Sequence, residues 1–389
     1  MPVFTLTDTS KDVWVDTFAV RARELFPEGG GPAWSVSKRT LRGGKREGVD
    51  LIEVDNGRLA FSLIPTRGMA FWKAGLTDLP LAWKSPITDG PVHPAFVNLQ
   101  NGGGLGWLEG FDELLARCGL ETNGAPYTDG ETRYGLHGRI GNTPARYVSV
   151  QAGDRPDAPI VVEGHVDETR LFFTQVRMKT TVTTAPGSRL VTVRDEFFNP
   201  SDTPQEVEIL YHWNFGPPLL EEGARFAAPL KTVVPRNARA AEGLGHFDVY
   251  NAPEPGFAEQ VYFFELLADP ADGRTLTLLR DRAGSKGVAL RFLKSELPAF
   301  TLWKATGGLK SGYVTGLEPG TNYPNPKPFE KKNGRVVSLE PGGSYVAETT
   351  LEVLDTAEAV AAAEAEIARI QKQAAPVIHK DPVAPFASP

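Results

Sequence analysis

Cysteine is nearly absent from this sequence: Cys118 is the only one among 389 residues. A disulfide within the chain is therefore excluded, and a zinc site built from thiolates is not expected. Histidine is scarce as well, with 6 residues, and no two of them follow the His-x-His or His-x-x-x-His spacing that zinc sites often use. We therefore expect no metal site.

Long apolar runs and long basic runs are also missing. No stretch of about 18 apolar residues could span a membrane, and the N-terminal residues lack the basic region and apolar core of a signal peptide. The net charge is −7, which disfavours nucleic acid as a partner because phosphate binding needs a basic face. We therefore expect a cytoplasmic protein with neither a membrane nor a nucleic acid as partner, and its oligomeric state stays open.

Glycine and proline, by contrast, are abundant, with 40 and 32 residues. Such a composition is typical of a chain with many turns and few long helices. A hairpin is predicted where residues 49–54 lead through Asp55-Asn56-Gly57 into residues 58–64. The spacing of the predicted strands indicates an all-β fold, a large antiparallel β-sandwich. The further strands are predicted at residues 159–166, 171–183, 189–198, 205–212, 275–280, 287–293, 301–304 and 345–351.

The two ends of the chain differ from this middle part. Residues 12–26 have an amphipathic pattern that favours a short helix. Residues 356–373 are rich in Ala, Glu and Ile and predict a helix with Asp355 as its N-cap. Residues 374–389 are rich in Pro and Ala and predict an extended or disordered tail. The apolar stripe of the helix would consist of Val360, Ala363, Ile367 and Ile370.

These patterns divide the chain into three parts: an N-terminal lead-in (residues 1–44), the β-sandwich (45–353) and a C-terminal helix with its tail (354–389). Within the sandwich, residues 98–146 are rich in glycine and are the least strand-like part. The run Asn101-Gly102-Gly103-Gly104-Leu105-Gly106 lacks the Gly-Lys-Ser/Thr end of a phosphate loop and does not link a strand to a helix, so nucleotide binding is not expected. A long glycine-rich excursion on a β scaffold usually lines or covers a site.

Three titratable residues stand at strand ends or in loops, where they could meet in one site. Glu318 follows a strand-like run and precedes a turn rich in Gly, Pro and Asn, so a strand holds the carboxylate while a turn exposes it. His137 lies in a glycine-flanked loop, and His212 ends the strand at 205–212. Each has a plain alternative: Glu318 could cap the turn, and the histidines could make structural hydrogen bonds. Together, one carboxylate and two imidazoles indicate proton-transfer chemistry.

Longer motifs around these residues resemble the galactose mutarotase-like superfamily, the aldose 1-epimerases and their relatives. The resemblance extends over roughly residues 45–353 and is one of motif order. Residues 101–142 differ from the established mutarotases, so the resemblance points to a separate branch and leaves the sugar open. The motifs are the segments 106–126 and 134–142, His-Trp-Asn-Phe at 212–215 and Leu-Glu-Pro-Gly-Thr-Asn at 317–322.

The resemblance implies a sandwich of the galactose mutarotase type with its site on the concave face. It implies aldose 1-epimerase chemistry with Glu318 as base, His212 as acid and His137 as the group that orients the ring oxygen. Because interconverting two anomers needs proton transfer alone, no cofactor is expected. The partner would be a small-molecule sugar, bound by Arg67, Asn101, Trp107, Asp112, Asn123, Arg139, Asp248, Trp303 and Asn322.

Two other functions stay open on the same fold: a carbohydrate-binding protein without turnover, and another epimerase or lyase acting on a modified sugar. A matched acid and base favours an enzyme, because binding requires neither. Trp107 and Trp303 could be core residues or could offer an apolar face to a sugar ring. Arg139 could pair with the charge of an acidic sugar, or hydrogen-bond hydroxyls and brace its loop if the sugar is neutral.

Overall fold

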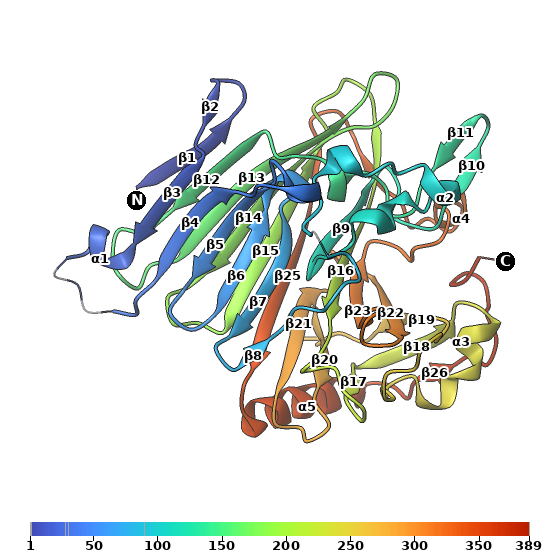
Figure 1. Cartoon of the computed structure of the whole chain (residues 1–389). Helices are drawn as coiled ribbons and strands as arrows, with labels where there is room; N and C mark the ends of the chain where they lie inside the picture. The colour runs from blue at the N-terminus through green and yellow to red at the C-terminus, as the bar shows by residue number, and fades with distance from the viewer. Residues whose placement is uncertain (1, 28, 30, 89, 389) are drawn as a thin grey trace.

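Two large β-sheets pack face to face in the computed structural model, which describes every residue except 1, 28, 30, 89 and 389 (Figure 1). Strands of the first sheet follow one another in the order β17 (Arg225–Ala227), β20 (Arg274–Arg280), β21 (Gly287–Leu293), β25 (Ser344–Leu354), β15 (Leu190–Phe198), β14 (Gln175–Thr184), β13 (Ile160–Thr169), β12 (Tyr147–Gln151), β1 (Val3–Asp8) and β2 (Val13–Trp14).

The second sheet contains the strands on which the candidate site is built. Its order is β26 (Val377–Ile378), β18 (Leu230–Pro235), β19 (Gln260–Leu266), β22 (Ala299–Thr306), β23 (Tyr313–Gly320), β16 (Gln205–Phe215), β9 (Leu115–Leu120), β7 (Ala70–Leu76), β6 (Ala60–Ile64), β5 (Asp50–Asp55), β4 (Ser35–Thr40) and β3 (Thr17–Arg21), with β24 (Val337–Leu339) on β16 and β8 (Leu79–Pro80) on β7. Neighbouring strands of both sheets are antiparallel, except that β26 runs parallel to β18.

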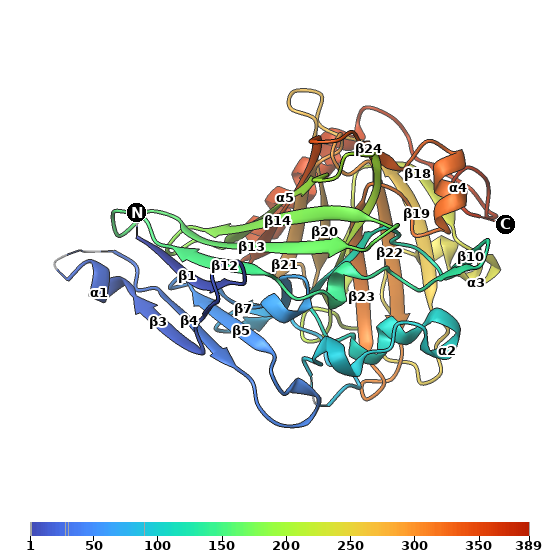
Figure 2. The same ribbon diagram turned by 90° about the horizontal axis from the view of Figure 1, so that it is seen from above.

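Helices and a separate two-stranded hairpin lie beside the two large sheets, and Figure 2 shows the two layers from above. The hairpin consists of β10 (Tyr127–Asp129) and β11 (Thr132–Tyr134). The α-helices are α1 (Ala22–Leu25), α2 (Asn101–Gly104), α3 (Ala238–Glu242), α4 (Lys327–Lys332) and α5 (Ala357–Gln371). The 3-10 helices are η1 (Gly44–Arg46), η2 (Pro65–Arg67), η3 (Pro94–Phe96), η4 (Gly106–Gly110), η5 (Ile140–Asn142) and η6 (Leu244–His246).

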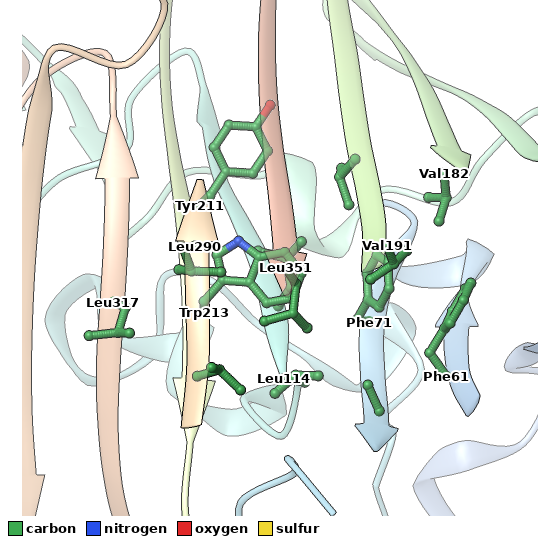
Figure 3. Packing of buried hydrophobic residues seen from close by; sticks show 14 of the residues in the cluster. Phe61, Phe71, Leu114, Val182, Val191, Tyr211, Trp213, Leu290, Leu317 and Leu351 are labelled. Atoms are coloured by element: carbon green, nitrogen blue, oxygen red, sulfur yellow. The ribbon is translucent and has the colours of Figure 1, made fainter. Parts of the chain in front are cut away.

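The core lies between the two sheets, where each strand contributes one apolar face. Val191 and Leu351 of the first sheet belong to one buried cluster with Phe71, Trp213 and Leu317 of the second (Figure 3). Removing an aliphatic or aromatic side chain of this kind from water stabilises the fold by about 1.5–3 kcal/mol. The core therefore holds β16 and β23 rigidly from one side.

Strand β16 shows how the two-residue period divides side chains between the core and the opposite face. Tyr211 and Trp213 enter the core between the sheets. His212 alternates with them and therefore faces the other side of the second sheet. That side is covered by a second apolar cluster, to which Trp107 and Phe111 of the glycine-rich segment belong.

The sequence-based prediction of an all-β sandwich with a C-terminal helix is confirmed. The predicted hairpin forms as β5 and β6. The predicted stripe on α5 is buried against β20 and β21. The N-cap, however, is Thr356 and not Asp355, because the Thr356 hydroxyl accepts the amide of Ala359 at 3.2 Å.

The helix predicted at residues 12–26 is wrong. This stretch forms β2, β3 and the single helical turn α1. The pairing of Thr17–Arg21 with β4 buries Val20, and such cross-strand contacts outweigh a weak amphipathic pattern. The first 44 residues thus supply β1 and β2 to the first sheet and β3 and β4 to the second.

Two further segments have more structure than the sequence suggests. The glycine-rich part contains β9, a fully buried strand between β16 and β7. The C-terminal tail is extended but packs on the body of the protein. Its Phe386 ring lies 5.5 Å from the ring of Tyr323, and its backbone carbonyl accepts a hydrogen bond from the Asn325 side chain at 2.8 Å.

Candidate active site

The register between β16 and β23 brings the two principal candidates together. Trp213 pairs with Leu317, and Leu210 pairs with Gly320, so His212 lies opposite Glu318 on the same face of the sheet. Nε2 of His212 is 3.2 Å from Oε1 of Glu318. Their side chains are only 5% and 3% exposed. The chain thus forms a buried acid–base pair from residues that are 106 positions apart.

Gly316 provides the room for this pair. It lies two residues before Glu318 on β23 and faces the same side of the sheet. A β-carbon at Gly316 would collide with Oε1 of Glu318 and would lie 3.1 Å from Cε1 of His212. Glycine is therefore required at position 316 by the close approach of the Glu318 carboxylate.

His137 reaches the pair from the glycine-rich segment. Its Nδ1 lies 2.8 Å from the carbonyl oxygen of Asn123, and its ring centroid is 5.5 Å from that of His212. Its backbone has φ of 59°, a left-handed conformation that is rare outside glycine. Two hydrogen bonds hold it there: its amide donates to Gly124 at 3.0 Å, and its carbonyl accepts from Gly119 at 3.1 Å.

Aromatic rings surround the two imidazoles. The ring centroids of Phe111 and Trp303 lie 5.2 Å and 5.3 Å from that of His212. The Trp107 centroid is 4.7 Å from that of His137. These rings keep water from the pair, which strengthens electrostatic interactions inside the site.

This burial sets the protonation of the pair. It raises the pKa of the Glu318 carboxyl well above its usual 4.5, an effect that Glu259 reinforces and Arg236 opposes. Burial and the neighbouring His137 lower the pKa of His212 well below 6.5, although the hydrogen bond with Asn214 acts the other way. Burial also lowers the pKa of His137 to about 4, against the pull of its hydrogen bond with Asn123.

The raised pKa of Glu318 and the lowered pKa of His212 both favour the form in which the pair holds one proton, on the Glu318 carboxyl, beside a neutral imidazole. The sequence predicts Glu318 as base and His212 as acid. These roles require the other form of the pair, in which the proton has moved from the Glu318 carboxyl to the His212 imidazole. Such a pair can donate a proton to one oxygen and accept one from another.

The outer rim of the site was not predicted. Glu259 forms an ion pair with Arg236 at 2.6 Å and accepts the indole N–H of Trp303 at 2.7 Å. The side chains of Glu259 and Arg236 are 46% and 36% exposed. No motif marks Glu259 in the sequence, because its position depends on the pairing of Val261 with Trp303 between β19 and β22.

Asn123 and Asn322, both predicted to bind sugar, instead lie buried beneath His137. The Asn123 amide group donates to Oδ1 of Asn322 at 2.9 Å. Both residues also bond the Glu208 carboxylate, Asn322 through its side chain at 2.9 Å and Asn123 through its backbone amide at 3.2 Å. In this arrangement Asn123 contacts His137 through its carbonyl oxygen, and Asn322 contacts Asn123 and Glu208.

Arg67 and Asp112 are also held in internal contacts. Arg67 is 1% exposed, forms an ion pair with Glu113 at 2.5 Å and donates to Oδ1 of Asn142 at 2.8 Å. Asp112 accepts the indole N–H of Trp72 at 2.8 Å, and burial raises the pKa of its carboxyl to about 6.

The remaining predicted sugar-binding residues lie outside this cluster. Asn101 donates to Glu109 at 2.8 Å on the surface. Asp248 lies 3.7 Å from Arg225. Arg139 is exposed and borders a cavity of about 200 Å³ that neither Glu318 nor His212 lines. Of the predicted set, the structure brings together Glu318, His212, His137, Trp107 and Trp303.

The sandwich is that of the galactose mutarotase-like superfamily. The family described as "Domain of unknown function (DUF4432)" matches residues 46–353, and the chain belongs to this family. A solved structure from Klebsiella pneumoniae, of a protein provisionally named aldose 1-epimerase, is 37% identical, with a TM-score of 0.95 over 98% of this chain and 99% of that chain.

More distant structures share the fold alone. A galactose mutarotase-like protein from Clostridium acetobutylicum is 14% identical, with a TM-score of 0.55 over 88% of this chain and 99% of that chain. A protein from Escherichia coli K12, also provisionally named aldose 1-epimerase, is 12% identical, with a TM-score of 0.52 over 79% of this chain and 99% of that chain. No curated protein matches the sequence.

None of the helices among the described residues has both the length and the apolar character needed to cross a membrane. The same part of the chain contains no group of three or more His, Cys, Asp or Glu side chains placed to hold a metal ion.

Proposed function

We propose that the protein is an aldose 1-epimerase-like isomerase that interconverts the α and β anomers of a small sugar. The single observation that supports this most strongly is the buried contact of 3.2 Å between Glu318 and His212. A proton donor and a proton acceptor at this distance can act on two oxygens bonded to the same carbon.

Anomer exchange requires that geometry. A base removes the proton from the hydroxyl on C1 while an acid protonates the ring oxygen, which is also bonded to C1. The ring opens, the C1–C2 bond rotates, and the ring closes on its other face with the two roles exchanged. Each proton transfer by a positioned side chain typically contributes about 10²–10⁴-fold in rate. The cycle consumes no cofactor.

In this proposal the sugar lies against Trp303 and the rim. An indole face suits the C–H surface of a pyranose, and the carboxylate of Glu259 can accept hydrogen bonds from hydroxyl groups. His137 lies on the opposite side of His212 from the core and can accept a hydrogen bond from a ring substituent. The provisional name of the Klebsiella pneumoniae relative agrees with this chemistry.

A carbohydrate-binding protein on the same fold would need neither the acid nor the base. Magnetisation-exchange NMR of anomer mixtures separates the two functions across a panel of aldoses, uronic acids and ketoses. We expect catalytic amounts of the protein to accelerate exchange for at least one sugar class. Binding without acceleration for every sugar would establish the non-catalytic alternative.

A further inference from the structure

Asn214 fixes the hydrogen on the His212 ring. Oδ1 of Asn214 lies 2.5 Å from Nδ1 of His212. The amide nitrogen of Asn214 donates to the carbonyl oxygens of Glu113 at 3.0 Å and of His212 at 2.8 Å. This settles the orientation of the amide, so its oxygen must face the imidazole and accept a hydrogen bond. Nδ1 of His212 therefore carries the hydrogen, and Nε2 is the basic nitrogen that faces Glu318.

The tautomer of His137 is fixed in the same way, by the backbone carbonyl of Asn123. A backbone carbonyl can only accept, so the contact of 2.8 Å between Asn123 and Nδ1 of His137 also requires a hydrogen on Nδ1. Asn123 cannot move away easily, because Asn322 and Glu208 hold its side chain and its backbone amide. These three supporting residues are fully buried.

We propose that Asn214, Asn123, Asn322 and Glu208 are positioning residues that lock both His212 and His137 in the Nδ1–H form. Each ring then presents Nε2, a proton acceptor, to the site. The catalytic role of these fixed tautomers rests on the proposed function. The tautomers themselves follow from the hydrogen bonds alone and can be tested whether or not the protein acts on a sugar.

Two other histidines of the chain provide internal controls. Nδ1 of His93 accepts the backbone amide of Ala95 at 3.1 Å, so that hydrogen must sit on Nε2. Nε2 of His165 lies 3.0 Å from Oε1 of Glu163, a carboxylate that accepts. The structure therefore assigns opposite tautomers to two pairs of histidines in one molecule.

The test is two-bond ¹H–¹⁵N correlation NMR on the full chain with ¹⁵N-labelled histidine, at a pH of about 7.5. The chain has 6 histidines, and each signal is assigned by its loss in a single His→Gln variant. We expect Nδ1–H for His137 and His212, and Nε2–H for His93 and His165. An Nε2–H signal for His137 or His212 would overturn the proposal.

Asn214→Asp probes the consequence of the lock. The carboxylate keeps one acceptor oxygen on Nδ1 of His212, while its second oxygen replaces the amide nitrogen that donated to the carbonyls of Glu113 and His212. An ionised carboxylate there favours the imidazolium, so the pKa of His212 should rise by about 1–3 units in the same NMR titration. The titratable groups beside His212 are Glu318 on β23, at 3.2 Å, and His137, whose ring centroid is 5.5 Å away. Glu259, paired with Arg236, contacts the Trp303 side chain that packs on His212. None of these changes in the variant.

Asn199→Asp is the matched control for this substitution. Asn199 is also fully buried, and its amide donates to the backbone carbonyls of Thr203 and Leu339 at 2.8 Å and 2.9 Å, away from the site. It should leave the His212 titration unchanged. Equal shifts in both variants, or an Nε2–H tautomer of His212 in the native protein, would contradict the positioning role. If Asn214→Asp does not fold, the tautomers of the native protein decide.

Discussion

Two consecutive residues of β16, Tyr211 and His212, contact buried ionisable side chains on opposite faces of the sheet. The two groups differ in how completely their hydrogen bonds are satisfied. Tyr211 donates to Asp195 at 2.9 Å on the core side, where Asp195 is paired with Arg117 at 2.6 Å. His212 faces Glu318 on the opposite side at 3.2 Å.

The guanidinium of Arg117 is fully hydrogen-bonded. It donates to both Asp195 oxygens, to the carbonyls of Gly68 and Met69, and to the hydroxyl of Thr180. Oε1 of Glu318, by contrast, has no hydrogen-bond partner of good geometry within the described part of the chain. A fully satisfied buried pair serves structure, whereas a buried group left without partners is available to a ligand.

The largest expected effect comes from removing the exchangeable proton. Glu318→Gln should slow anomer exchange by about 10²–10⁴-fold, because the amide keeps the shape but cannot transfer a proton. Sugar affinity should stay within about tenfold, since binding does not depend on that transfer. Polarimetry gives the rate, and calorimetry gives the affinity. A normal rate in this variant would remove Glu318 from the mechanism.

Removal of Asp195 from its pair with Arg117 should affect stability and leave the exchange rate unchanged. Asp195→Ala should lower the free energy of unfolding by about 3–5 kcal/mol, because it leaves Arg117 as an uncompensated buried charge. Denaturation in urea measures this loss, and the exchange rate per folded molecule should remain close to the native value. Stability near that of the native protein would show that the pair on the core side is not a structural element.

The pH dependence of stability distinguishes the pairs further. Above a pH of about 6.5 an unfolded chain has released both protons of Glu318 and His212, whereas the folded pair still holds one. Native stability should therefore fall as the pH rises from about 6.5 through the raised pKa of Glu318, by at most about 1.4 kcal/mol per unit. The Glu318→Gln variant has no titratable proton at this position, so its stability should lack this contribution to the fall over this pH range.

Urea unfolding of the two proteins at several pH values between about 6 and 9 measures the difference directly. Other buried groups, such as Glu208, titrate in both proteins and cancel in the comparison. Parallel stability profiles would mean that Glu318 is ionised in the folded protein.

The smallest expected effect concerns the rim. Trp303→Phe keeps a ring but removes the hydrogen bond to Glu259, which is worth about 0.5–1.5 kcal/mol. Sugar affinity should fall by roughly 2–10-fold with little change in the rate at saturating sugar. Trp72→Phe is the control, because it removes an equivalent hydrogen bond to Asp112. A larger loss for Trp72→Phe would place the sugar elsewhere.

The sequence could predict those features of the fold and of the candidate site that have a local cause. Alternation and turn residues predict β5, β6 and most strands of the first sheet, and the motifs indicate Glu318, His212 and His137 as candidates, which the fold brings together. The sequence could not show that Asn123 and Asn322 are buried, because their surroundings come from strand pairing and from Glu208 on β16. It also could not reveal Glu259, whose position follows from the register of β19 and β22.

Arg67 illustrates the same limit. A strand-end arginine beside a glycine turn favours an exposed contact with a sugar, yet the fold encloses it with Glu113, a residue 46 positions away. The helix expected near the N-terminus failed for a related reason, because β4 offers a pairing edge that no local pattern reveals.

The most direct test of the central claim measures anomer exchange by NMR for the native protein, Glu318→Gln and Asp195→Ala at equal concentrations of folded protein. We predict acceleration by the native protein and by Asp195→Ala, and an acceleration smaller by about 10²–10⁴-fold with Glu318→Gln. Equal acceleration by all three proteins, or loss of exchange in Asp195→Ala alone, would contradict it.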